Sequence, residues 1–128
     1  MVLLKHVALT MDSKSHAMDF YEKLLDAELV KEFQVSNKLV MQIFGVDVSE
    51  DEISVLVFEI ENNQFEIFIT GEKRINRFDH VCIAVENLND FVKQCNELDI
   101  IVSLITKGEK ELVFIQDFVG NHFEIKEK

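Results

Sequence analysis

The sequence contains no proline and no tryptophan, and it has only two cysteines, four glycines and one tyrosine in 128 residues. Two cysteines, Cys82 and Cys95, are too few for a disulfide framework, and no signal peptide precedes the first strand-like segment. No apolar run approaches the length of a transmembrane helix. We therefore expect a soluble protein of the reducing cytoplasm.

Positive charge is also scarce, because 13 Lys and Arg stand against 24 Asp and Glu and give a formal net charge of −11. Nucleic-acid binding needs a basic face for the phosphates, so this balance argues against any general role of that kind. What the sequence has in quantity is apolar residues, at 48%, including eleven phenylalanines. This composition is typical of a globular protein whose core is filled by Phe, Ile, Leu and Val.

One strand-like segment occurs twice, as Leu4–Met11 and again as Phe78–Val85. Both copies alternate apolar residues and place a histidine near the start, His6 in the first and His80 in the second. A single histidine on an apolar strand is usually structural. Two histidines at matching positions of a repeat need a common explanation.

The pattern of elements repeats as well. In the first half the sequence predicts strands at 3–11, 29–35, 53–60 and 64–70, with a helix capped by Asp12 or Ser13 after the first strand. The segment between Ser36 and Gly45 could be a strand, but a Ser cap and a terminal Gly favour a short helix.

In the second half the sequence predicts a strand at 79–85, a helix from about Asn87 to Asp99, and strands at 101–106, 111–116 and 122–127. Each half therefore forms a β-α-β-β-β module. We expect an α+β fold in which two such modules in tandem form a concave mixed sheet, within one domain spanning 1–128. The modules are 1–71 and 78–128, joined by a linker at 72–77.

Strand alternation indicates which side chains share a face. In the last strand of each half, apolar residues should pack on the helices, so Glu66 and Glu124 lie on the opposite face. His6 and His80 lie on that same face of their strands. Two modules packed side by side would bring two imidazoles and two carboxylates into one cluster, a donor set that suits a divalent metal such as Ni, Co, Zn, Mn or Fe.

Each of these residues also has an ordinary structural explanation, as a hydrogen-bonding histidine or a glutamate at a solvated edge. The matched positions together favour the metal site. His122, Phe68 and Cys82 share the same face and are candidates for contacting a substrate. His122 could equally be a hydrogen-bonding residue at the rim, and Cys82 a small lining residue, since nothing in the sequence marks its thiol as activated.

The paired modules and these two histidines and two glutamates resemble the vicinal oxygen chelate superfamily. That group includes glyoxalase I, methylmalonyl-CoA epimerase, fosfomycin-resistance thiol transferases, extradiol dioxygenases and bleomycin-resistance proteins. The resemblance covers nearly the whole chain and is strongest over 78–128, where the ending Gly120-Asn121-x-x-Glu124 keeps the family order. The four-ligand set is most similar to glyoxalase I, whereas the epimerases typically carry Gln in place of Glu66 and the bleomycin-binding proteins lack the metal residues.

The resemblance implies a metal-dependent lyase or isomerase of the lactoylglutathione lyase type. We expect a homodimer, because a two-module sheet of this length leaves apolar edges to cover. A metal would chelate two neighbouring substrate oxygens and stabilise an enediolate formed by proton removal next to a carbonyl, with Glu124 or Glu66 as the base. The alternatives are an epimerase-like enzyme and a non-catalytic protein in which Phe68 and Phe58 hold a small hydrophobic molecule.

The chain departs from the family pattern in two places. The usual Asp-Pro-Asp-Gly-Asn loop is here Asp117–Asn121 without its proline. The first module also lacks clear counterparts of the basic residues with which glyoxalase I holds the glutathione carboxylates, which disfavours a glutathione adduct as the substrate.

Overall fold

The structure is a computed structural model that describes residues 4–73 and 79–128. The predicted strand starts at Leu3 and Phe78, and the part of the linker from Arg74 to Arg77, lie outside the described residues. The chain divides into two compact units, Met1–Gly71 and Glu72–Lys128. Within the described ranges, no helix is long and apolar enough to cross a membrane.

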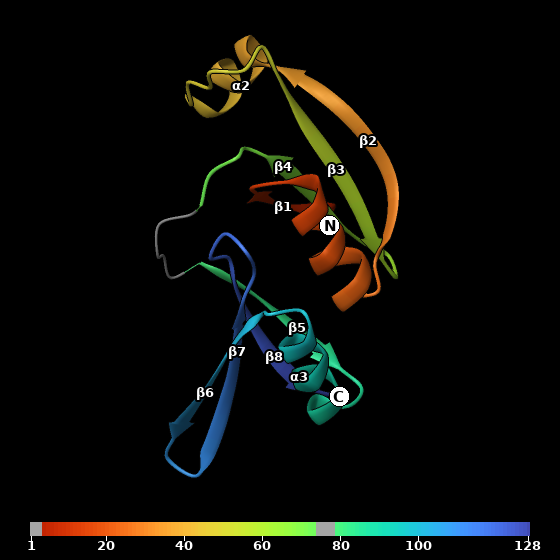
Figure 1. Cartoon of the computed structure of the whole chain (residues 1–128), viewed down its shortest axis with the longest axis vertical. Helices are drawn as coiled ribbons and strands as arrows, with labels where there is room; N and C mark the ends of the chain where they lie inside the picture. The colour runs from red at the N-terminus through yellow and green to blue at the C-terminus, as the bar shows by residue number, and fades with distance from the viewer. Residues whose placement is uncertain (1–3, 74–78) are drawn as a thin grey trace. The chain divides into compact units, whose positions relative to one another are not determined.

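The first unit contains a four-stranded sheet in the order β1-β4-β3-β2, in which β1 and β4 are parallel and the other pairs antiparallel (Figure 1). Its elements are β1 (His6–Met11), α1 (Lys14–Ala17), η1 (Met18–Leu24), β2 (Glu28–Ser36), α2 (Asn37–Phe44), β3 (Glu52–Ile60) and β4 (Asn63–Ile69).

The second unit repeats this topology with the strand order β5-β8-β7-β6, and again only the first pair is parallel. Its elements are β5 (His80–Val85), α3 (Leu88–Glu97), β6 (Ile101–Lys107), β7 (Lys110–Gln116) and β8 (His122–Glu127). The predicted α+β fold of two β-α-β-β-β modules is confirmed, with one mixed sheet in each module.

Polar caps begin the helices where the sequence predicts them. The Ser13 side chain accepts a hydrogen bond from the His16 backbone, and the Asn87 side chain accepts one from the Asp90 backbone at 2.9 Å. The ambiguous segment after β2 is a helix, because the Ser36 hydroxyl accepts from the Leu39 backbone at 3.1 Å. Gly45 ends this helix with a φ of 67°, which an L side chain rarely adopts.

The first long helix differs from the regular α-helix that the apolar spacing predicts. From Met18 it widens into a π-helix, in which the Leu25 backbone N–H donates to the Phe20 carbonyl at 3.1 Å. The wider turns direct Phe20, Tyr21 and Leu24 onto the sheet, where all three are buried. Packing against the sheet thus overrides the spacing of a regular helix.

Tyr21 stacks on Phe58 with ring centroids 5.1 Å apart, so Phe58 belongs to the helix-covered face of the first sheet. The register confirms this, because Phe58 is paired with the buried Phe65. The hypothesis that Phe58 could line a ligand cup is therefore wrong: alternation along β3 turns its side chain into the core.

The core of the second unit lies between α3 and its sheet. Phe91 and Cys95 of α3 are buried, as are alternate residues of β7 and β8, namely Val113, Ile115, Phe123 and Ile125. β6 runs one residue further than predicted, since Lys107 pairs with Lys110. The turn is therefore Gly108–Glu109, with a φ of 61° at the glycine.

Candidate functional site

The first candidate pair joins β1 and β4. The parallel register places His6 opposite Gln64 and Ala8 opposite Glu66, so His6 and Glu66 are diagonal neighbours on one face of the sheet. His6 Nδ1 lies 3.5 Å from Glu66 Oε2, with side chains 43% and 24% exposed. One nitrogen donor and one oxygen donor are thus already adjacent and accessible.

The second unit has the same arrangement. His80 lies opposite His122 and Cys82 lies opposite Glu124, so His80 and Glu124 have the diagonal relation of the first pair. The His80 ring meets the edge of the Phe114 ring with centroids 5.6 Å apart. Since Phe114 is the β7 partner of Glu124, the imidazole reaches across β8 at the level of the carboxylate.

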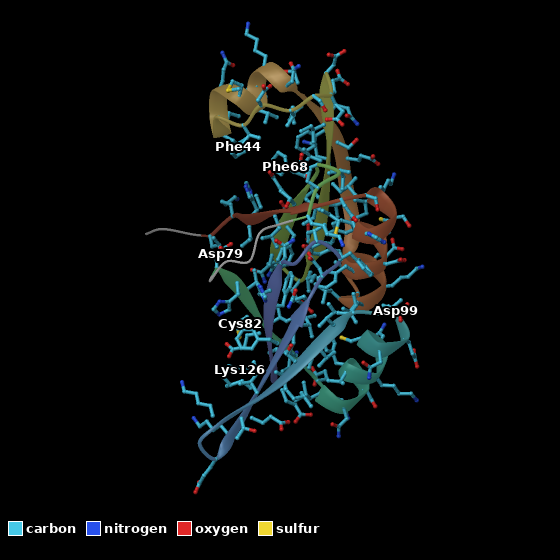
Figure 2. All side chains as sticks on the ribbon, turned by 60° about the vertical axis from the view of Figure 1, so that its left-hand side comes forward. Phe44, Phe68, Asp79, Cys82, Asp99 and Lys126 are labelled. Carbon is cyan, nitrogen blue, oxygen red and sulfur yellow. The ribbon has the colours of Figure 1, made fainter. Side chains whose placement is uncertain are left out.

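In each unit, we call the face of the sheet that carries the histidine and the glutamate the site face. Along β5 the residues His80, Cys82 and Ala84 are exposed, while the alternating valines and isoleucine are partly buried. Figure 2 shows Cys82 and Lys126 on the side of the second sheet that faces away from α3. Asp99, labelled in the same figure, lies near the end of α3. The alternation predicted from the sequence therefore holds on this strand.

Cys82 lies opposite Glu124 in the register of β5 and β8. Partial desolvation, and after it the neighbouring carboxylate of Glu124, raise the pKa of the Cys82 thiol above its ordinary value. The thiol is therefore protonated near neutral pH in the absence of a metal, which agrees with a lining residue better than with an activated nucleophile.

A cavity of about 220 Å³ opens on the site face of the first unit. Its walls come from β2, α2 and β4 and are apolar except at Glu66: Phe33, Val35, Leu39, Val40, Ile43, Phe44, Glu66 and Phe68. Phe44 and Phe68, which are labelled in Figure 2, meet edge to face with ring centroids 5.6 Å apart. Phe68 is thus brought together with the candidate ligand Glu66 in one pocket.

The loop Asp117–Asn121 leads into β8 and is held by one buried carboxylate. Asp117, 5% exposed, accepts hydrogen bonds from the backbone N–H groups of Val119 at 3.1 Å and Asn121 at 2.8 Å, and from the Asn121 amide at 2.6 Å. Burial raises the pKa of Asp117, and these hydrogen bonds partly oppose the rise. The loop is therefore ordered without a proline, and it positions His122 and Glu124.

A family model described as the Glyoxalase/Bleomycin resistance protein/Dioxygenase superfamily matches residues 3–125. The chain belongs to this superfamily. Comparison with curated proteins gives no match. Among solved structures, a glyoxalase family protein from Enterococcus faecalis is 20% identical, with 96% of this chain and 95% of that chain covered and a TM-score of 0.70.

Two further members extend the comparison. A mutant of the fosfomycin resistance protein FosX from Listeria monocytogenes, complexed with Mn(II) and 1S,2S-dihydroxypropylphosphonic acid, is 12% identical over 98% of this chain and 92% of that chain, with a TM-score of 0.74. The trypanothione-dependent glyoxalase I of Leishmania major is 14% identical over 99% and 87%, with a TM-score of 0.73. At these identities the likeness shows the shared fold alone.

The histidines and glutamates of the two pairs can be compared with the donors that a divalent metal requires, such as the Mn(II) of the FosX complex. Each unit places an imidazole diagonally opposite a carboxylate on its site face, and these are donors that divalent transition-metal ions accept. Within either unit, among the residues that the structure describes, no three His, Cys, Asp or Glu side chains form a group that could hold a metal ion.

Two features of the first unit were not predicted from the sequence. The apolar cavity depends on α2 folding over the site face, and its sequence signal was the double apolar pairing of Leu39 with Ile43 and of Val40 with Phe44 at helical spacing. The other is an ion pair at the start of α1, where His16 Nδ1 lies 2.8 Å from Asp12 Oδ1. That pair fixes the end of β1 to the first helix.

Proposed function

We propose that this superfamily member is a metal-dependent enzyme of the glyoxalase type, a lyase or isomerase that removes a proton next to a carbonyl. The observation that carries the proposal is the repeated register: each parallel strand pair places a glutamate diagonally opposite a histidine on the site face. The matched positions of a histidine and a glutamate in both halves of the chain favour one shared role over two separate structural ones.

In this proposal His6, Glu66, His80 and Glu124 hold one divalent ion, Ni, Co, Zn, Mn or Fe. The two pairs would meet within a single domain or across a homodimer, both of which would bring the site faces together. The ion would supply a Lewis acid that stabilises the negative charge developing on the substrate oxygen. Glu124 is our choice of base, with the proton passing to its carboxylate, and Glu66 is the alternative.

The apolar cavity beside Glu66 indicates what kind of substrate this site would take. Its volume of about 220 Å³ is below the roughly 300 Å³ at which sites for whole drug-sized ligands begin. The cavity would therefore receive one apolar substituent while the oxygens of the substrate reach the metal. Phe68 would contact this substituent, and His122 would contact the polar part of the substrate at the start of β8.

Metal removal should abolish activity. Protein purified without chelator should contain a transition metal, and dialysis against EDTA should stop exchange of substrate hydrogen with solvent deuterium in a panel of hemithioacetals and 2-substituted acyl-CoA thioesters. Adding back Ni, Co, Mn or Zn should restore the exchange, because the Lewis acid returns.

Elemental analysis measures the metal content, and the deuterium-exchange assay measures the activity. A metal content below about a tenth of an equivalent, with no gain in exchange on adding any of these ions, would contradict the enzyme proposal. Two imidazoles and two carboxylates that form a metal site should bind an added ion and lose any protons they carry.

Truncating the cavity wall should change substrate preference. Phe44→Ala should lower kcat/KM for a hemithioacetal of phenylglyoxal about tenfold relative to that of methylglyoxal, because an aromatic contact of about 0.5–1.5 kcal/mol is lost. Met41→Ala, on the same helix and 46% exposed, is the matched control, because Met41 does not line the cavity. Equal effects of the two substitutions would refute the assignment of the cavity to the substrate.

The same cavity favours a second candidate function, a binding protein that sequesters a small hydrophobic molecule without chemistry. Seven of the eight lining side chains are apolar, which such a protein would need. The two functions differ in their use of metal. Affinity for an apolar ligand that survives EDTA and the loss of Glu66 would favour the binding protein.

A further inference from the structure

The second unit has a cavity of its own, which the proposed function does not use. Its volume is about 310 Å³, and its walls include Lys110 of β7 and Lys126 of β8. Val113 and Ile125, which also line it, form the last pair of the β7–β8 ladder, and the two strands diverge beyond this pair (Figure 1). The cavity therefore lies where the ladder opens.

Alternation along the two strands places both lysines of this cavity on the site face. Lys126 is two residues beyond Glu124 on β8, and Figure 2 shows it on the side of the sheet that faces away from α3. Lys110 shares the face of Phe114, which is the β7 partner of Glu124. Two cationic side chains thus line a cavity whose wall also includes Glu124, the proposed base.

A third lysine adds to this positive charge. Lys107 lies directly opposite Lys110 in the pair that closes the hairpin between β6 and β7. Like charges in directly opposed positions destabilise a sheet, and an anion bound beside them would remove the repulsion. Within residues 4–73 and 79–128, neither these two lysines nor Lys126 forms an ion pair with a carboxylate. They lack one although acidic residues outnumber basic ones 24 to 13.

The three glutamates that line the same cavity have other surroundings or another role. Glu127 accepts a hydrogen bond from the Leu88 backbone N–H at 3.1 Å, so its charge is held at the start of α3. Glu111 lies on the other face of β7, together with Val113. Glu124 is a ligand of the ion in the proposed function, and the ion would balance its charge. The lysines therefore remain available for an anion from outside the chain.

The first unit is built differently at the corresponding connection. There α2 joins β2 to β3 and contributes apolar walls to the cavity beside Glu66, whereas the turn Gly108–Glu109 joins β6 directly to β7. The first unit therefore has an apolar cavity beside its glutamate, and the second unit has a cavity with two lysines beside Glu124. Two cavities of such different chemistry would suit two different substituents of one substrate.

We propose that the cavity of the second unit binds an anionic group of the substrate, with Lys110 and Lys126 as its direct contacts and Lys107 beside them. We call this the anion site. Its part in the reaction rests on the proposed function, whereas its binding of an anion does not. Lysine ammonium groups bind phosphate as point charges through charge-assisted hydrogen bonds. A phosphate or phosphonate, with up to two negative charges, should therefore bind more tightly than a carboxylate.

Inorganic phosphate is the probe for the anion site. Titrated into metal-free full-length protein, it should shift the backbone amide NMR signals of Leu112 and Lys126 in a saturable manner. Lys126→Met should weaken this binding about tenfold, because a hydrogen bond between charged groups is lost. Lys93→Met is the matched control, since Lys93 is an exposed lysine of α3 that does not line the cavity. Absence of a saturable shift, or an equal loss in both variants, would overturn the inference and leave the proposed function standing.

Substrates that differ only in charge test the part of this site in the reaction. Hemithioacetals of phenylglyoxal with 2-mercaptoethanol, 3-mercaptopropionate and 2-mercaptoethylphosphonate carry a hydroxyl, a carboxylate and a phosphonate on the same short arm. In the exchange assay kcat/KM should rise in that order, and Lys126→Met should reduce the advantage of the phosphonate over the alcohol about tenfold, mainly through KM. Equal kcat/KM for the three substrates would overturn the role of the anion site. Exchange with none of them, while phosphate still binds, would contradict the proposed function instead.

Discussion

Replacing Glu124 by glutamine should lower turnover about a hundredfold or more, the usual effect of removing a general base. Glutamine has the size of glutamate, and the side chain is only partly buried on β8, so the fold should be unaffected. The amide accepts no proton and carries no charge to balance a divalent ion. Loss of the carboxylate should therefore lower both turnover and metal affinity, measured by the exchange assay and by metal titration.

Glu66→Gln separates the two roles of the glutamates. If Glu124 is the base and Glu66 only a ligand, Glu66→Gln should lower metal affinity and recover much of its turnover at saturating metal. Glu124→Gln should stay inactive under the same conditions, because added metal does not replace a missing base. The reverse pattern would assign the base to Glu66.

The matched control is Glu111→Gln. Glu111 is an exposed residue of β7 that lies on the same face of its strand as Val113 and Ile115, away from the site face. The substitution makes the same chemical change in the same sheet, and we expect turnover and metal content close to wild type. Unchanged metal content in both Glu66→Gln and Glu124→Gln would show that the metal site is wrongly assigned.

Strand alternation explains why so much of the site face could be predicted. A period of two fixes which side chains share a face once a strand is recognised, so Phe65 and Ile67 identified the core side of β4 and Glu66 the other. The helix caps at Ser36 and Asn87 could be predicted as well, because each cap depends only on a side chain and on the backbone N–H three residues later.

The errors arose where packing decides the conformation. Helical spacing predicts a regular helix through Phe20 and Tyr21, and only the sheet beneath it explains the π-helix. Phe58 was misplaced because six of the nine residues of β3 are apolar in an almost continuous run, which leaves alternation no clear signal. The cavity at Phe44 and Phe68 requires knowing that α2 lies against the site face. The helical spacing in α2 indicates an apolar helix face but not the surface against which that face packs.

Asp117→Ala should destabilise the folded protein and the loop that leads into β8. It removes the acceptor of two backbone N–H groups and of the Asn121 amide, and the loop that holds them is buried. An unsatisfied buried donor costs about 1–3 kcal/mol, so the free energy of unfolding should fall by about 3 kcal/mol in urea titrations. Metal affinity should fall too, because the loop positions His122 and Glu124.

Asp117→Asn supplies the control and a pH dependence. It keeps one oxygen for the backbone N–H groups and loses only the bond to the Asn121 amide, so it should destabilise less than alanine does. Burial raises the pKa of Asp117 in the folded protein above the unfolded value of about 3.9. Between those two values the folded state binds more protons than the unfolded state, so lowering the pH through this window stabilises the wild type.

The amide of Asp117→Asn does not titrate. The stability of the wild type relative to this variant should therefore increase as the pH falls from 7 through the raised pKa towards about 3.9, and level off below it. Other carboxylates titrate in both proteins, and their contributions cancel in the difference. A difference that shrinks as the pH falls would mean that hydrogen bonds to the ionised carboxylate outweigh its burial, and that the loop into β8 depends on the charge of Asp117.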